Sequence, residues 1–235
     1  MWSNPPNTTM GRLCTFFCTD TGIDRLNALL DDPANDARPF SQLQTEATKY
    51  ETDRYIRPRL TAAALKTYPL DPADDPGLLR CEPWGLAKQM IAPHQLEIRR
   101  RGADRVELHY GEWDAHRTVY MDGRKRLASQ PPSRLGYSVG HWEGEALVVE
   151  TSGVTKGQTQ WRSEHSDQLH VVERFTRAAS PKGDTLLLTA TVTDPWSLKE
   201  PLVIKKIWSW SPTSQIAPYD ACEPVIAVKK GTSEP

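Results

Sequence analysis

The chain has few of the features that mark membrane spans, nucleic-acid binding and the common nucleotide and hydrolase folds. Nowhere in its 235 residues do eighteen apolar residues follow one another, so we expect no membrane span. The formal net charge of −1 gives no electrostatic basis for binding nucleic acid. Motifs of the G-x-S-x-G, Walker and G-x-G-x-x-G types are absent, which argues against a serine hydrolase, a nucleotide enzyme and a Rossmann oxidoreductase.

Cysteine is scarce, and its spacing does not support zinc. Cys14 and Cys18 lie four apart without a second Cys or His pair at finger spacing, and no two of the six histidines have helical ligand spacing. Three histidines on a barrel could still converge, but we expect no metal and no other cofactor. Cys81 and Cys222 share a Cys-Glu-Pro context and could be neighbours. Because the N-terminus lacks a basic and an apolar signal region, we expect a cytoplasmic protein with free thiols.

Phenylalanine is also scarce, with four residues against eight tryptophans. Tryptophan is bulky and carries one N–H, so it suits cavity walls and interfaces as well as cores. An aromatic-rich wall would suit a flat hydrophobic ligand held by a few polar groups, and the alternative is that these residues are core. The aromatic candidates are Trp84, Trp113, Trp142, Trp161, Tyr110, Tyr120 and Tyr137.

Residues 1–77 are expected to form a helical arm and a linker. Ile23, Leu26, Leu29 and Leu30 fall on one helical face after Asp20 or Thr21 as the cap. Ser41 and Gln44 match a capping box, a short helix is expected over Thr61–Tyr68, and residues 71–77 form a linker. The arm has too little apolar surface to fold alone. It must pack on the rest of the chain or on a second subunit, and we expect a homodimer.

From residue 78 to residue 235 the pattern predicts a mainly β domain. The expected strands are Leu96–Arg100, Arg105–Tyr110, His116–Met121, Leu135–Trp142, Ala146–Ser152, Leu169–Thr176, Thr185–Thr193, Leu202–Ser209 and Tyr219–Val228. Hairpin-length turns join most of them, which favours an antiparallel up-and-down barrel of eight or nine strands over a two-sheet sandwich. Such a barrel can hold one small ligand, and residues 122–134 and 153–168 are candidates to cover its mouth.

Four segments resemble a widespread group of bacterial proteins. They are Arg80-Cys-Glu-Pro-Trp-Gly85, Arg117-Thr-Val-Tyr-Met-Asp-Gly123, the hairpin from Tyr137 to Thr151, and Leu169-His-Val-Val-Glu-Arg-Phe175. Members of that group share Cys-x-Pro-x-Gly, Ser-x-Gly-x-Trp-Glu-Gly-Asp and Val-Val-Glu-Arg-Phe motifs. The resemblance covers roughly residues 78–225 and implies a lipocalin-like (calycin) barrel, with a relation to cofactor-free lyases of lignin-derived aromatic acids. This chain differs in having Glu145 and Ala146 where Asp-Thr is usual, and in lacking the export signal of many members.

Arg117 and Glu173 are the main candidates for chemistry. An inward Arg117 needs a carboxylate partner, either Glu112, Glu150 or Glu173, or the carboxylate of a bound acid. Glu173 shares a strand face with Val171 and Phe175, where burial would raise its pKa and suit it to proton transfer. The alternative for both residues is a structural ion pair in the barrel.

These residues suggest a cofactor-independent lyase, of the decarboxylase or ring-opening type, for a small aromatic carboxylic acid bound inside the barrel. Arg117 would anchor the acid, Glu173 or His170 would move a proton, and Tyr137 would be a secondary donor. An isomerase or hydrolase, a non-catalytic carrier of hydrophobic ligands, and a dimeric interaction protein remain alternatives. The expected substrate-binding residues are Trp84, Glu112, Tyr120, His141, Trp142, Glu150, Trp161 and His165.

Overall fold

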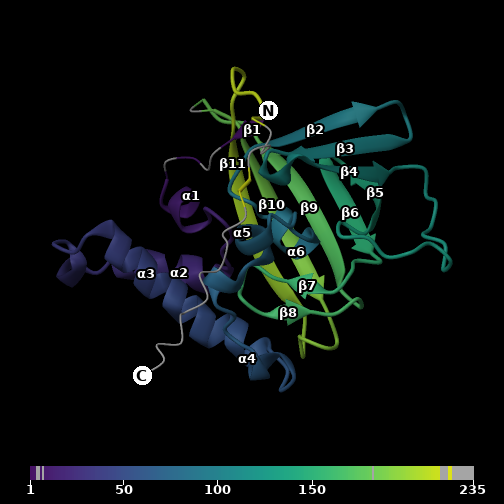
Figure 1. Ribbon diagram of the computed structural model, residues 1–235. Helices are drawn as coiled ribbons and strands as arrows, with labels where there is room; N and C mark the ends of the chain where they lie inside the picture. Colours follow the sequence, from purple (N-terminus) through teal and green to yellow (C-terminus); the bar gives the residue numbers. More distant parts are fainter. Residues whose placement is uncertain (4–5, 7, 182, 218–221, 224–235) are drawn as a thin grey trace.

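A closed β-barrel forms the centre of the molecule, as the strand pattern predicts (Figure 1). The structure is a computed structural model that describes residues 1–3, 6, 8–181, 183–217 and 222–223. Within these residues the barrel strands follow the order β1-β11-β10-β9-β6-β5-β4-β3-β2 around the barrel. Their bounds are β1 Trp2–Ser3, β2 Leu96–Arg101, β3 Arg105–Tyr110, β4 Ala115–Tyr120, β5 Tyr137–Glu143, β6 Ala146–Ser152, β9 His170–Ala178, β10 Thr185–Thr193 and β11 Leu202–Trp210. A separate two-stranded sheet joins β7 (Gly157–Gln158) to β8 (Glu164–His165).

One strand pair departs from the expected antiparallel order. β5 runs parallel to β4, with Val119 opposite Ser138 and Tyr120 opposite Val139. The connection over 121–136 is too long for a hairpin, and it returns the chain to the end of the barrel from which β4 started. Gly140 permits the close approach of these strands, because a Cβ there would lie 2.7 Å from Cγ1 of Val119. The expected strand Tyr219–Val228 lies outside the described residues except at 222–223.

The helical arm forms as expected in outline and differs in its ends. α2 (Asp20–Leu30) is capped by Thr19, whose hydroxyl accepts from the Gly22 N–H. α3 (Phe40–Glu51) begins one residue before Ser41, so the expected capping box is wrong and Pro39 caps the helix without a side-chain bond. Only a 3₁₀ turn, Ala64–Lys66, forms within the helix expected over 61–68. The remaining α-helices are α1 (Thr9–Leu13), α4 (Arg57–Arg59), α5 (Pro76–Arg80) and α6 (Leu86–Gln89).

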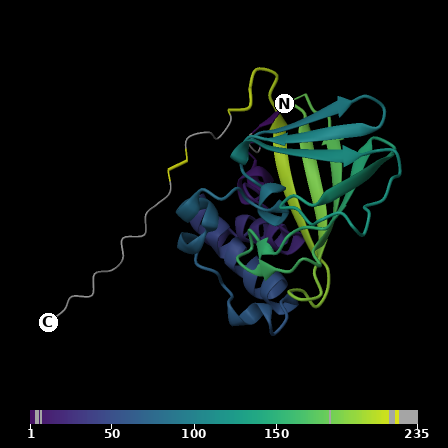
Figure 2. The ribbon, with the colours of Figure 1, turned by 45° about the vertical axis from the view of Figure 1, so that its right-hand side comes forward.

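The arm packs on the barrel of its own chain. Leu26, Leu43 and Ala47 form a second buried cluster with Ile207, which projects from the outer face of β11. Figures 1 and 2 show the arm helices along the barrel wall that contains β11. The arm was expected to pack either on the rest of its own chain or on a second subunit, and the structure shows the first. The homodimer stays a prediction.

The barrel interior is filled with apolar side chains. Alternation along β10 turns Leu186, Leu188, Ala190 and Val192 inward, where each is at most 4% exposed. Each large aliphatic side chain buried in this way contributes about 1.5–3 kcal/mol. Barrels of this strand number have interiors that side chains can fill. The main core cluster therefore occupies much of the space in which a ligand was expected.

The free thiols expected from the sequence are not found. Cys14 is bonded to Cys18, and Cys81 is bonded to Cys222, with Cα separations of 4.7 and 5.8 Å, within the range that a disulfide spans. The sequence had suggested Cys81 and Cys222 as possible neighbours, and the structure joins them although they lie 141 residues apart. Among the described helices, each is too short or too polar to cross a bilayer.

Candidate functional site

Arg117 and Glu173 meet inside the barrel. β4 turns Arg117 inward between Ala115 and Val119, and β9 turns Glu173 inward between Val171 and Phe175. Arg117 Nη1 donates to Glu173 Oε1 at 3.0 Å, and Nη2 donates to Oε2 of the same carboxylate. This bidentate ion pair is the structural alternative considered for both residues.

The other donors of Arg117 are also engaged. Nε donates to Ser138 Oγ at 2.8 Å, Nη1 to the Tyr110 hydroxyl at 3.2 Å, and Nη2 to Thr151 Oγ1 at 2.6 Å. Burial raises the pKa of Tyr110 to about 12, so its phenol stays neutral. A guanidinium has five N–H donors, and all five are used within the protein. As folded, Arg117 has no donor left for a substrate carboxylate.

The other predicted residues of the hairpin point to the opposite face of the sheet. Because Ser138 and Thr151 turn inward to Arg117, their neighbours Tyr137 and Glu150 turn outward. The ring of Tyr137 stacks on that of Tyr120, with centroids 5.1 Å apart. The sequence suggested one cavity shared with Arg117, whereas the strand register separates the two groups by the thickness of the sheet.

A cavity of about 430 Å³, here called the tyrosine cavity, lies against this outer face. Tyr137, His141 and Glu150 line it from β5 and β6, and residues 123–126 line it from the β4–β5 connection. Lys125 and Arg126 were not among the residues predicted from the sequence, although the basic run at 124–126 was a visible signal.

Two cations of this cavity have no carboxylate partner in the described part of the chain. The Arg126 guanidinium donates to the Gln130 carbonyl oxygen, and its buried Nε has no hydrogen-bond partner there. Lys125 makes no ion pair with any described residue. Arg124, by contrast, pairs with Asp122 and lies over the Tyr120 ring at 4.3 Å. The cavity therefore combines an aromatic ring, the carboxylate of Glu150 and two cations that make no ion pair with a described residue.

Histidine–carboxylate pairs border the same face. His170 Nε2 lies 2.8 Å from Glu150 Oε1, and Glu150 lines the tyrosine cavity. His141 Nε2 lies 3.1 Å from Glu143 Oε1. An imidazole oriented by a carboxylate is a common arrangement for proton transfer, and in both pairs the side chains remain partly exposed.

Two of the predicted aromatic residues, Trp161 and Trp84, do not line the tyrosine cavity. Trp161 is buried in the core, edge-on to Phe17. Trp84 packs edge-on against Trp113 beside α6 and lines a different cavity, of about 270 Å³. The third, Trp142, is 46% exposed at the β5–β6 turn. These residues do not form one aromatic wall.

Glu112 and His165 are also placed apart from the tyrosine cavity. Glu112 pairs with His94 at 2.8 Å, and burial raises the pKa of its carboxyl. Burial lowers the pKa of His165, whose Nδ1–H donates to the Ser166 carbonyl oxygen at 2.9 Å. Neither side chain contacts Arg117 through an observed hydrogen bond.

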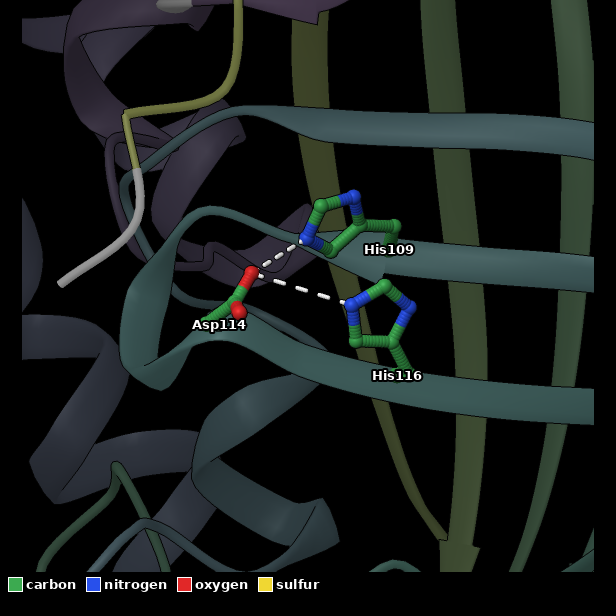
Figure 3. Close-up of side chains that lie close together, drawn as sticks. All are labelled: His109, Asp114 and His116. Carbon is green, nitrogen blue, oxygen red and sulfur yellow. Dashed lines mark hydrogen bonds and ion pairs between the residues drawn. The ribbon is translucent and has the colours of Figure 1, made fainter. Parts of the chain in front are cut away.

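One cluster has the composition of a metal site, although the sequence led us to expect none. His109, Asp114 and His116 offer ligand atoms that all lie within 4.8 Å of one another (Figure 3). The signal in the sequence was the β3–β4 hairpin, because His109 and His116 are equidistant from its turn and pair across the strands.

Comparisons of this chain with protein-family models, curated proteins and solved structures gave no match.

Proposed function

We propose that this protein binds a small aromatic carboxylic acid in the tyrosine cavity. The observation that carries the proposal is the presence of Lys125 and Arg126, without carboxylate partners among the described residues, beside the ring of Tyr137. An aromatic acid presents a flat apolar ring and one carboxylate, which match the tyrosine and the guanidinium. The ligand class is the one expected from the sequence, and the proposed site is outside the barrel.

Arg126 is the better placed of the two cations. Its guanidinium makes one hydrogen bond in the described structure, from Nη2 to the Gln130 carbonyl oxygen, so other Nη donors remain for a ligand carboxylate. The side chain is held against Gly153, where an added Cβ would lie 2.4 Å from Arg126 Nε. A guanidinium fixed in this way loses little freedom when it binds a ligand.

A second function is favoured by the His170–Glu150 pair. The lyase activity implied by the motif resemblance needs a proton donor for the carbon that loses carbon dioxide. His170, oriented by Glu150, would supply that proton, and Tyr137 would be the secondary donor. In this proposal Arg117 and Glu173 support the barrel and do not touch the substrate. The reaction would need no cofactor.

Ligand binding is tested by calorimetry with 4-hydroxybenzoate and with its uncharged amide. We expect saturable binding of the acid, with at least tenfold weaker binding by Arg126→Gln, since one charge-assisted hydrogen bond is worth about 1.5–3 kcal/mol. Lys66→Gln, an exposed lysine on the arm, is the matched control and should bind normally. Equal binding of acid and amide, or normal binding by Arg126→Gln, would refute the site.

Turnover is measured on the same proteins as carbon dioxide release from aromatic acids. A lyase should lose turnover in His170→Gln while it keeps acid binding. A carrier should bind the acid without any release of carbon dioxide in the wild type. The two functions are therefore separated by one assay.

The sequence predicts a cytoplasmic protein, but the two disulfides favour another compartment. Disulfides such as Cys14–Cys18 and Cys81–Cys222 persist mainly in oxidising compartments. We therefore propose that the protein works outside the reducing cytoplasm. Fractionation of the native host with thiol labelling would decide between the two locations.

A further inference from the structure

Two histidines and an aspartate converge on the outer face of the β3–β4 hairpin. His109 and His116 are directly opposed across the two strands, and their rings stack with centroids 3.9 Å apart. Both Nε2 atoms face one oxygen, Asp114 Oδ1, at 2.6 Å from His109 and 3.7 Å from His116. Figure 3 shows the carboxylate to one side of the stacked rings, facing one nitrogen of each imidazole.

The spacing of these atoms suits a small transition-metal ion. Zinc lies about 2.0–2.1 Å from nitrogen and oxygen ligands, so neighbouring ligand atoms of a tetrahedral site are about 3.3 Å apart. The two observed Nε2–Oδ1 distances, 2.6 and 3.7 Å, fall on either side of that value. All three ligand atoms lie within 4.8 Å of one another, so the side chains would have to close around an ion to complete the geometry.

Carboxylates also lie behind both imidazoles. Glu107 Oε1 is 3.0 Å from Nδ1 of His116, and Glu97 Oε2 is 4.0 Å from Nδ1 of His109. Metal-ligating histidines usually donate their second ring N–H to such a group, which fixes the tautomer and orients the ring. With Glu107 holding the Nδ1 proton of His116, the Nε2 lone pair of that ring would point toward Asp114, and Glu97 adds negative charge near His109.

The backbone that presents Asp114 is in an unusual conformation. Trp113 and Asp114 have φ values of 58° and 45°, although neither is glycine. Consecutive residues of this kind cost roughly 1–3 kcal/mol each and cluster at functional sites. A relaxed turn would be easier to form, and the strained one brings the carboxylate over the paired histidines.

We propose that His109, Asp114 and His116 bind one divalent transition-metal ion of the zinc class. Imidazole and carboxylate ligands suit zinc and its neighbours better than magnesium or calcium, which prefer oxygen alone. Three protein ligands leave a coordination position for water or a small ligand. A cavity of about 550 Å³ adjoins the two histidines, and Asp114 and His116 are exposed, so the cluster is open to solvent. This site is separate from the tyrosine cavity and does not depend on the proposed function.

The metal is tested by calorimetry on chelator-treated protein, with Zn²⁺ alone as the probe. We expect one Zn²⁺ per chain in the wild type. Co²⁺ is a second probe, because its visible absorption reports the geometry of nitrogen and oxygen ligands. Glu107→Gln should weaken Zn²⁺ binding by roughly 10- to 100-fold, as loss of an outer carboxylate does elsewhere.

Asp114→Gly separates metal binding from folding. Glycine tolerates the φ of 45° at this position, so the metal-free variant should be at least nearly as stable as the wild type. It should nevertheless lose the Zn²⁺-dependent rise in melting temperature. His94→Gln is the matched control, since His94 is half-exposed and pairs with Glu112 rather than with Asp114. It should bind Zn²⁺ normally.

Two results would overturn the proposal. One is the absence of saturable Zn²⁺ binding by the wild type. The other is Zn²⁺ binding that persists unchanged in both Asp114→Gly and His116→Ala, which would place the ion elsewhere. Normal 4-hydroxybenzoate binding by Arg126→Gln would refute the tyrosine cavity as the acid site but would leave the Zn²⁺ result unaffected, so failure of either proposal is distinguishable from failure of the other.

Discussion

Replacing Arg117 with methionine tests whether the buried ion pair supports the barrel. The variant loses five donated hydrogen bonds and leaves the Glu173 carboxylate, which is 0% exposed, without a cation. Removing one partner of a buried pair costs about 3–5 kcal/mol, because an uncompensated charge stays in a medium of low polarity. Since domains are stable by only about 5–15 kcal/mol, we expect a greatly lowered urea midpoint.

Removing both charges should restore part of this loss. In Arg117→Met/Glu173→Leu, Ser138 and Thr151 can still bond to each other at 2.9 Å. The Tyr110 hydroxyl is then the main group without a partner, at a cost of about 1–3 kcal/mol. The double variant should therefore be about 2 kcal/mol more stable than Arg117→Met alone.

The assay is urea unfolding followed by tryptophan fluorescence, together with calorimetry of 4-hydroxybenzoate binding. A structural pair predicts a double variant that is folded, binds the acid in the tyrosine cavity and keeps any turnover of the wild type. If the double variant folds but no longer binds or converts the acid, Arg117 and Glu173 act on the ligand, and the assignment to structure is refuted. An Arg117→Met variant as stable as the wild type would contradict the expected loss of about 3–5 kcal/mol.

Two buried titratable groups predict opposite responses of stability to pH. Burial raises the pKa of Glu51 to about 7, so the stability linked to its protonated form is complete below pH 4.5 and is lost as pH rises through 7. Glu51→Gln keeps an acceptor for the Thr19 N–H and should remove up to about 3 kcal/mol of this pH dependence. Urea titrations at pH 4.5 and 8 measure it, and an equal change in the free energy of unfolding in variant and wild type would contradict the prediction. Burial lowers the pKa of Lys206 to about 7, so wild-type stability should gain a contribution as pH rises from 7 to 10.5. Circular dichroism melts should show that Lys206→Met loses this gain, and an equal gain in both proteins would exclude Lys206 as its source.

Local patterns were sufficient for most of the barrel. Alternation and turn residues gave Arg105–Tyr110, Ala146–Ser152 and Thr185–Thr193 with the bounds that the structure has. Strand β1 has two residues and pairs with β11, whose partner positions lie over 200 residues away, so no local pattern marks it. No local pattern predicts the parallel pairing of β4 and β5 either, because it depends on the path of the long connection over 121–136.

The main error in the predicted site was the face of the sheet on which the hairpin residues were expected to lie. Alternation correctly put Arg117 and Glu173 on inward positions of their strands, but it could not say which residues of the polar hairpin faced them. The small side chains of Ser138 and Thr151 do so, and they therefore place Tyr137 and Glu150 outside. A sequence in which both faces of a strand are polar does not reveal which face is buried.

The two proposed sites follow from where polar groups remain unpaired. Inside the barrel, desolvation makes an unpaired charge costly, and the network around Arg117 is accordingly closed. On the outer face water solvates an unpaired cation, so Lys125 can lack an ion-pair partner with little loss of folding stability and remain available to a ligand. Arg126 is half-buried and pairs with no described carboxylate, so a ligand carboxylate would supply the missing counter-charge. The His109–Asp114–His116 cluster also lies on the outer face, where the positive φ values of Trp113 and Asp114 mark a strained turn. Function in this barrel is therefore to be sought on the outer face of β3 to β6, and variants of the interior pair should change stability far more than they change ligand affinity.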